Sequence, residues 1–304
     1  MISGQFHPGC TVSSLDGALR FYGETLGVEH VRGQVSDQPY LALVTGLPGC
    51  SLKLGFARIE GDDVPLELIE CVNPPASLSG AGFGIVGTAH QCYLVDDLAG
   101  AYDRLTRAGV SFLAEPQALG DGPWADARGA FLQDPDGFLI ELIEQPARPN
   151  GHARLVRTHH FGLTVSNLDA VLSFLCHQLQ LTETSRYACD GAYLRLSSRL
   201  KDGRMRAATV SVPGTQVAIE LWEFRTAAAA PARVATNSIG SGHLCFLVGD
   251  IMSTYASLSS HGIRFVGPPA EVTAGVNKGA YAIYFWGPDD LRFELFQKPP
   301  LASA

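Results

Sequence analysis

Four stretches of the chain carry apolar residues at the three- and four-residue steps that place them on one face of an α-helix. The first stretch follows the polar pair Ser13 and Ser14, either of which can cap a helix, and the second stops at Gly109. The four stripes are Leu15, Ala18, Leu19, Tyr22 and Leu26; Leu98, Ala101, Tyr102, Leu105 and Ala108; Leu168, Val171, Leu172 and Leu175; and Ile251, Tyr255 and Leu258. The pattern therefore predicts four helices.

Between the helices, apolar residues alternate or run in short blocks typical of strands, as in FLIELIE (138–144) and LRFELFQ (291–297). The turn signals DPDG (134–137) and GPDD (287–290) precede these two strands. Each helix follows a strand led by a histidine, and the last strand after it contains a glutamate. We expect an α+β fold in which four β-α-β-β-β modules pair into two domains with cupped mixed sheets.

The four modules arise from a duplication. The segment HPGCTVSSLDGALRFYGETLG begins at His7, and HFGLTVSNLDAVLSFLCHQLQ begins 153 residues later at His160. The same offset relates the segments at His90 and His243. It also relates Glu67 to Glu220 and Glu141 to Glu294. The repeat predicts a first domain at 1–147 (modules at about 5–72 and 88–146), a linker at 148–157 and a second domain at 158–304 (modules at about 158–225 and 241–298).

The charge, the apolar runs and the cysteines of the chain indicate which partners it binds and in which compartment it acts. The 22 Lys and Arg against 30 Asp and Glu give a net charge of −8, which disfavours nucleic acid as a partner. The N-terminal residues lack a signal-peptide pattern, and we find no apolar run of about 18 residues to cross a bilayer. Seven irregularly spaced cysteines favour reduced thiols. We expect a cytoplasmic protein that acts on a small molecule, binds no membrane, and has a homodimer as an open option.

Histidines and glutamates at matched strand positions are the candidate chemistry. Glu67 lies between Leu66 and Leu68, so its side chain points to the opposite face of the strand from theirs. A carboxylate among apolar neighbours is costly unless it is paired, protonated or bound to a metal. Two imidazoles and two carboxylates that converge form a set suited to a divalent ion such as Zn, Ni, Co, Mn or Fe(II). Open coordination positions would then accept substrate oxygens.

The chain resembles the vicinal oxygen chelate superfamily, which includes glyoxalase I, extradiol dioxygenases and bleomycin-resistance proteins. The resemblance rests on the HxGxTVSxLDxAxxFY opening, the HxxxxVDDLxxAYxRLxxAG second opening and the DPDGxLIELIE close. It covers nearly the whole chain. It implies a metal inside each cup, with ligands at His7, Glu67, His90, Glu141, His160, Glu220, His243 and Glu294. Whether the modules pair within a half of the chain or across the halves stays open.

The resemblance also implies a reaction. A substrate with two adjacent oxygens would chelate the metal, and the metal would stabilise the negative charge that develops on an oxygen. In glyoxalase-like members a metal-site glutamate moves protons between neighbouring carbons. By resemblance that base is Glu141 or Glu67, with Glu294 or Glu220 in the other half. We therefore favour a redox-neutral lyase or isomerase.

Two other functions compete with this one. Extradiol ring cleavage needs Fe(II) held by two His and one Glu, which His160, His243 and Glu294 can supply, with Tyr284 as a neighbouring tyrosine. Against it, the family's additional acid–base histidine has no counterpart, and Glu220 adds a fourth ligand. The third class is a non-catalytic protein that binds a small ligand.

The sequence also makes predictions about residues that lie near the candidate ligands. His159 should face away from His160 by strand alternation, and Glu70, Glu144 and Glu223 should pair with exposed cations. Cys92 and Cys245 lie on the same face as His90 and His243 and are expected to be small buried side chains. The candidate wall residues of the pockets are Tyr40, Trp124, Arg128, Tyr187, Trp222 and Tyr281.

Overall fold

The computed structural model describes residues 1–77, 85–120, 122–144, 153–191, 193–195, 203–225 and 237–300, with only the backbone described for 30–34. Its elements follow the four predicted modules, which we number module 1 (2–73), module 2 (89–144), module 3 (155–225) and module 4 (242–297). Residues 148–152 of the predicted linker lie outside the described residues, and residues 155–157 already belong to the first strand of module 3.

Modules 1 and 3 begin with long strands. Module 1 contains β1 (Ile2–Val12), α1 (Leu15–Arg20), the π-helical turn η1 (Phe21–Leu26), β2 (Glu29–Ser36), α2 (Pro39–Thr45), β3 (Ser51–Arg58) and β4 (Leu66–Asn73). Module 3 contains β9 (Leu155–Thr164), α4 (Leu168–Ser173), η3 (Phe174–Gln178), β10 (Thr182–Cys189), β11 (Arg204–Ser211) and β12 (Ala218–Arg225).

Modules 2 and 4 have shorter first strands and longer helices. Module 2 contains β5 (Ala89–Val95), α3 (Leu98–Arg107), β6 (Gln117–Ala118), η2 (Gly122–Trp124), β7 (Arg128–Gln133) and β8 (Leu139–Glu144). Module 4 contains β13 (Gly242–Val248), α6 (Ile251–Ser260), β14 (Arg264–Phe265), β15 (Ala270–Glu271), β16 (Tyr281–Trp286), η4 (Pro288–Asp290) and β17 (Arg292–Gln297).

Each module fixes the start of its helix in the same two ways. The side chains of Ser14, Asp97, Asn167 and Asp250 cap the helices by accepting a hydrogen bond from a backbone N–H three residues on. The first helical N–H then donates to a side chain of the module's last strand, which is Glu70, Glu144, Glu223 or Gln297. The three glutamates also pair with Lys53, Arg128 and Arg206, as predicted.

The modules pair across the two halves of the chain. β1 runs antiparallel to β13, which joins modules 1 and 4 in a nine-stranded sheet of order β14-β16-β17-β13-β1-β4-β3-β2, with β15 beside β16. β5 runs antiparallel to β9, which joins modules 2 and 3 in an eight-stranded sheet of order β10-β11-β12-β9-β5-β8-β7-β6. Each cup therefore takes one module from each predicted domain, so the division at 148–157 is a prediction about the repeat and does not describe how the sheets assemble.

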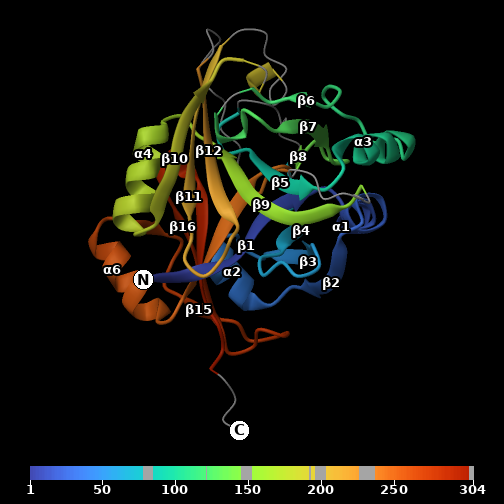
Figure 1. The fold of residues 1–304 in the computed structure, drawn as a ribbon. Helices are drawn as coiled ribbons and strands as arrows, with labels where there is room; N and C mark the ends of the chain where they lie inside the picture. The colour runs from blue at the N-terminus through green and yellow to red at the C-terminus, as the bar shows by residue number, and fades with distance from the viewer. Residues whose placement is uncertain are drawn as a thin grey trace.

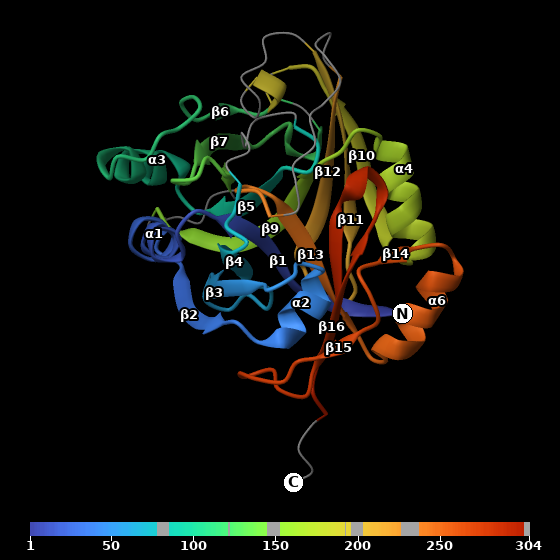
Figure 2. The same ribbon diagram turned by 180° about the vertical axis from the view of Figure 1, so that it is seen from behind.

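The helices cover the outer faces of the two sheets. Figure 1 shows α4 and α6 on one side of the molecule and α1 and α3 on the other, and Figure 2 shows the same arrangement from behind. One apolar core contains side chains of these four helices and of both sheets, among them Leu19, Leu105, Leu172 and Leu258. The opposite, concave faces of the sheets carry the candidate site residues. Among the described residues, no helix is long and apolar enough to span a membrane.

Candidate functional site

In each sheet, the two central strands pair in antiparallel orientation, and each contributes one histidine to a pair of neighbouring imidazoles. Gly9 of β1 lies opposite His243 of β13, and Gly162 of β9 lies opposite His90 of β5. A Cβ atom on Gly9 would lie 2.0 Å from Cε1 of His243, and one on Gly162 would lie 1.7 Å from Cε1 of His90. The glycine of each HxG motif therefore leaves room for the imidazole of the partner module.

The first of the two sites combines modules 1 and 4, and we call it the cavity site (His7, Glu67, His243 and Glu294). β4 and β17 run parallel to β1 and β13 and bring the two carboxylates beside the imidazoles. Oε2 of Glu67 lies 3.3 Å from Nε2 of His7 and 3.5 Å from Nε2 of His243. Oε2 of Glu294 lies 3.5 and 3.6 Å from the same two nitrogens. Each carboxylate thus reaches both imidazoles.

The second site combines modules 2 and 3, and we call it the buried site (His90, Glu141, His160 and Glu220). Nε2 of His160 lies 3.2 Å from Oε2 of Glu141 and 3.1 Å from Oε2 of Glu220. Nε2 of His90 lies 3.5 Å from the same Glu220 oxygen and 3.1 Å from Nε2 of His160. One potential ligand atom from each of the four residues lies within 4.8 Å of the others. In the cavity site, His7, His243 and Glu294 form such a set.

The donors at both sites fit a divalent metal. Among the described residues, the Nε2 atoms of His7 and His243, both carboxylate oxygens of Glu141 and Oε2 of Glu220 are buried with no hydrogen-bond partner. Buried polar atoms normally have one, because losing hydration without compensation is costly. Two imidazoles and two carboxylates are also a donor set that Zn, Ni, Co, Mn or Fe(II) accepts. The predicted residues are therefore candidate metal ligands that converge in two groups of four.

The charges within each site are divided unequally. At the cavity site burial opposes protonation of His7, yet Glu67 and Cys245 raise its pKa well above the usual value, whereas burial and His7 lower the pKa of His243. At the buried site Cys92 and Glu220 likewise outweigh burial and raise the pKa of His160, whereas burial lowers the pKa of His90. Without a metal, one imidazole of each pair therefore holds a proton between the carboxylates.

The cavity site opens into a hollow. A cavity of about 410 Å³ is lined by His7, Glu67 and Glu294 on its floor and by α2, strands of modules 1 and 4 and the segment 272–277 around it. Tyr40, one of the predicted wall residues, lies in this wall. The ring of Tyr284 lies 5.4 Å from that of His243. A small molecule in this cavity would contact the candidate ligands directly.

Aromatic side chains fill the corresponding space at the buried site. Trp222 stacks on His90 with ring centroids 3.7 Å apart, and it also contacts Phe131 and Tyr193. The hydroxyl of Tyr187 donates to Glu220. Trp222 lies 153 residues after Ile69, which lines the cavity at the other site. At the cavity site the smaller Ile69 leaves space at the position that Trp222 fills at the buried site.

The structure corrects three expectations about single residues. The set of His160, His243 and Glu294 does not assemble, because His160 belongs to the buried site. Arg128 does not line a cup, because it pairs with Glu144 on the helix-covered face. Tyr281 packs against the core beneath the helices rather than in a cup.

His159 does not face away from His160. The pairing of β5 with β9 shifts between Cys92–His160 and Tyr93–Thr158, so His159 lies in a β-bulge and the alternation of side chains breaks there. Its Nδ1 lies 2.8 Å from Nδ1 of His160, and Trp124 packs on its ring. The repeat places Phe6 at the same position of module 1, where β1 also has a bulge and Phe6 lines the cavity. Strand periodicity alone gives no signal for a bulge.

The two cysteines lie on the predicted faces. Cys92 is opposite His160 and Glu141 in the sheet, and Cys245 is opposite His7 and Glu294. Both are fully buried. Burial raises the pKa of both thiols, with a further rise from the nearby glutamate. Each site therefore has a neutral thiol packed between an imidazole and a carboxylate.

Known proteins resemble the chain in both sequence and fold. A model of the glyoxalase/bleomycin resistance protein/dioxygenase superfamily matches residues 4–142 and 157–295. A lactoylglutathione lyase of Schizosaccharomyces pombe is 28% identical over 177 residues, which are 55% of this chain and 56% of that protein. A 2-epi-5-epi-valiolone epimerase of an Actinomyces species is 29% identical over 145 residues, which are 46% of this chain and 79% of that protein.

The fold is also similar to that of a solved glyoxalase. The crystal structure of glyoxalase I from Zea mays has a TM-score of 0.65 at 18% identity, and the match covers 97% of this chain and 92% of that chain. At this identity the likeness concerns the fold alone. The chain spans about half the length of the S. pombe protein that it matches.

Proposed function

Since the chain belongs to the glyoxalase/bleomycin resistance protein/dioxygenase superfamily, we propose that it is a divalent-metal-dependent, glyoxalase-like lyase or isomerase. Its substrate is a small molecule with two vicinal oxygens, and the reaction takes place at the cavity site. The observation that carries this proposal is the convergence of two imidazoles and two carboxylates at a cavity of about 410 Å³, whose lining includes His7, Glu67 and Glu294.

His7, Glu67, His243 and Glu294 would hold the metal at this site. A bound dication would supply Lewis-acid chemistry, drawing negative charge onto the substrate oxygens. Glu67 and Glu294 both face the cavity, so either carboxylate can take a proton from the carbon beside one oxygen. The same carboxylate returns the proton to the neighbouring carbon, which makes the reaction redox-neutral.

Two measurements test the proposal together. Elemental analysis of protein purified without added metal should give two equivalents of a divalent metal per chain, one for each set of four ligands. The metal-loaded protein should also exchange the carbon-bound hydrogens of dihydroxyacetone with D₂O, followed by NMR. Glu67→Gln and Glu294→Gln should each lower this exchange, and the variant that loses more identifies the base. Glu141→Gln, at the buried site, is the matched control and should retain it.

Absence of bound metal, and of uptake on titration, would contradict the proposal and support a non-catalytic binder. Ring cleavage is the second candidate function, because His7, His243 and Glu294 form a compact set of two imidazoles and one carboxylate with Tyr284 beside it. Glu67 argues against it as a fourth donor within 3.5 Å of both imidazoles. Oxygen uptake with catechol that requires ferrous iron would reverse the ranking.

A further inference from the structure

The cavity over the cavity site is lined almost entirely by apolar and aromatic side chains. The polar exceptions besides the candidate ligands are Tyr40, Thr45, Asn277 and Tyr284. The rest are Phe6, Leu41, Val44, Leu52, Leu54, Phe56, Ile69, Val272, Ala274, Gly275, Val276, Ala282 and Phe296. Pockets of this kind bind the apolar body of a ligand and fix its orientation through a few polar groups.

Among the described residues, no positive side chain lines the cavity to receive an anionic substituent. Among the described residues that line it, none is Lys or Arg, and the charged groups are the carboxylates of Glu67 and Glu294 with His7 between them. A dication on the floor offsets those two carboxylates and leaves nothing for a third anion. The guanidinium of Arg292 lies over the ring of Tyr284 at 5.3 Å and is not part of the lining. An anion buried against these walls would lose its hydration without compensation.

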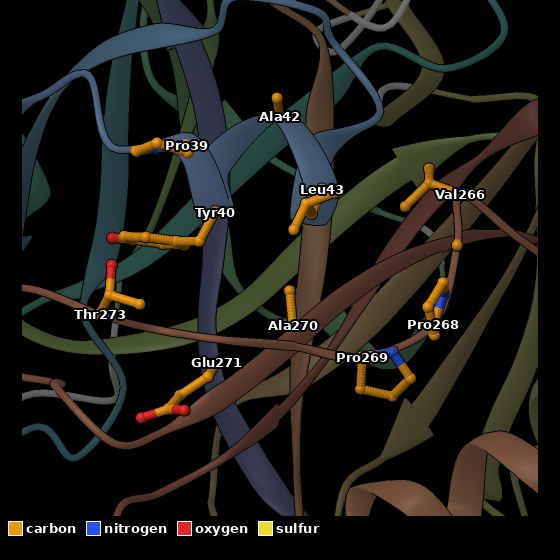
Figure 3. A pocket seen from close by; sticks show the side chains of 11 residues that line it. Pro39, Tyr40, Ala42, Leu43, Val266, Pro268, Pro269, Ala270, Glu271 and Thr273 are labelled. Carbon is orange, nitrogen blue, oxygen red and sulfur yellow. The ribbon is translucent and has the colours of Figure 1, made fainter.

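The approach to the cavity is apolar as well. Val276, which lines the cavity at its mouth, is 99% exposed. On the other side of α2 lies a second hollow, shown in Figure 3, between α2 and the segment 266–273. Tyr40 borders both hollows, and Leu43 projects into the outer one. The charged residue of the outer hollow is Glu271, an acid.

From this lining we propose that the cavity site selects an uncharged substrate whose vicinal oxygens are attached to an apolar, preferably aromatic, body. The inference rests on the proposed function and specifies its substrate class. It excludes thiol-tripeptide conjugates, whose carboxylates would need cationic partners inside the cavity. Lys298 is exposed, with its Nζ 6.0 Å from the ring of Phe6, and it is not among the residues that line the cavity.

Binding of matched chelators to the metal-loaded protein tests the inference by calorimetry. Acetohydroxamic, benzohydroxamic and 4-carboxybenzohydroxamic acids share one pair of vicinal oxygens and differ in the attached body. Benzohydroxamate should bind about tenfold or more tightly than acetohydroxamate, because its ring buries apolar area in the cavity. The 4-carboxy probe should lose at least about tenfold relative to benzohydroxamate, because its carboxylate has no cationic partner there. S-hexylglutathione should not compete with benzohydroxamate.

Variants assign the effect to this cavity. Val276→Arg places a cation at the exposed mouth and should restore much of the affinity for the 4-carboxy probe relative to benzohydroxamate, whereas Val276→Gln, the neutral control, should not. Glu294→Gln should abolish the preference for the ring.

Tighter binding of the 4-carboxy probe than of benzohydroxamate, or competition by S-hexylglutathione, would overturn the substrate class while the proposed function stands. Failure of all three hydroxamates to bind a protein that holds two metals per chain would instead contradict chelation itself, and with it the proposed function.

Discussion

The cavity site and the buried site have the same four ligand types at the same positions of the repeat, yet their surroundings differ. Ile69 leaves space above the first, whereas Trp222, at the equivalent position, stacks on an imidazole of the second. The side chains of His90, Glu141, His160 and Glu220 are at most 2% exposed. Duplication thus preserves a donor set, while single substitutions around it decide whether a substrate can reach it.

The comparison assigns different work to the two sites. At the cavity site the candidate ligands can serve chemistry because a ligand-sized space adjoins them. At the buried site the same donors join β5 to β9 beneath an aromatic cluster. A metal there would bind the folded protein and not the unfolded chain, and would therefore stabilise the fold.

The largest expected contrast comes from removing one imidazole at each site. His243→Ala should lower proton exchange about a thousandfold, since the floor of the cavity loses a ligand to a Lewis acid that contributes several kcal/mol. His90→Ala should retain exchange but lower the free energy of unfolding by about 3–5 kcal/mol, because Glu220 and Trp222 lose a buried partner. Exchange rates and urea unfolding on both variants measure the two effects. An equal loss of exchange in both variants would contradict the assignment of the reaction to the cavity site alone.

The next contrast exchanges the residues that set access. Ile69→Trp should fill the cavity with a ring and weaken benzohydroxamate binding about a hundredfold, while the metal content stays at two per chain. Trp222→Ile should empty space beside His90 and cost about 2–3 kcal/mol of stability. Calorimetry and thermal unfolding provide the readouts. If Ile69→Trp binds the probe as the parent does, the cavity is not the binding site.

The sequence predicts the modules and the ligand set because both follow local rules. Apolar stripes specify the helices, and the Leu66–Glu67–Leu68 alternation puts one side chain on the concave face. The 153-residue offset supplies the remaining members. The spacing from Glu67 to Glu70 likewise predicts a face-changing pair, which the contact of Glu70 with Lys53 bears out.

Module pairing could not be predicted, because it depends on which strand edges meet. β1, β5, β9 and β13 all consist mostly of buried residues, so patterning fits pairing within a half or across halves. His159 was misplaced for another reason, since one extra residue in a bulge reverses the face of a side chain. Access at Ile69 and Trp222 depends on packing in three dimensions. Module pairing and site access depend on contacts between residues far apart in the chain, and such contacts leave no periodic pattern in a single sequence.

Asp134 lies outside both sites and makes a pH-dependent contribution to the stability of the fold. Asp134 accepts hydrogen bonds from the N–H groups of Asp136 and Phe138 and from the hydroxyl of Tyr22, and it joins modules 1 and 2. Burial raises its pKa from 3.8 to about 7. At the equivalent positions of modules 3 and 4 stand Leu175 and Gly287, which do not titrate.

Between these two pKa values the folded protein keeps the Asp134 proton and the unfolded chain loses it. Stability from this group is therefore complete below about pH 4 and falls, by roughly 4 kcal/mol, as the pH rises to about 7. Asp134→Asn should flatten this slope, measured by urea unfolding across the range. Any pH dependence of stability that remains in Asp134→Asn can then be assigned to the titratable groups of the two sites. An unchanged slope would place the titrating group elsewhere.

The smallest expected effect concerns the residue beside the first histidine of each site. Burial lowers the pKa of His159 to about 3, so its ring is neutral and can accept a hydrogen bond from Nδ1–H of His160. That bond keeps a proton on Nδ1 of His160, so that Nε2, which faces Glu141 and Glu220, would offer its lone pair to a bound metal. At the cavity site Phe6 offers no such acceptor, and Nδ1 of His7 has no hydrogen-bond partner among the described residues.

The reciprocal exchange of these two side chains tests whether this contact distinguishes the sites. His159→Phe should weaken Co(II) binding at the buried site about tenfold, as loss of an orienting partner does for metal-bound histidines elsewhere. Phe6→His should strengthen binding at the cavity site by a smaller factor. Each variant is titrated with Co(II) against a competing chelator, in a background where Glu294→Gln or Glu141→Gln has weakened the other site. If both substitutions leave affinity unchanged, the bulge positions the backbone alone, and the environment of Trp222 and Ile69 is what separates the two sites.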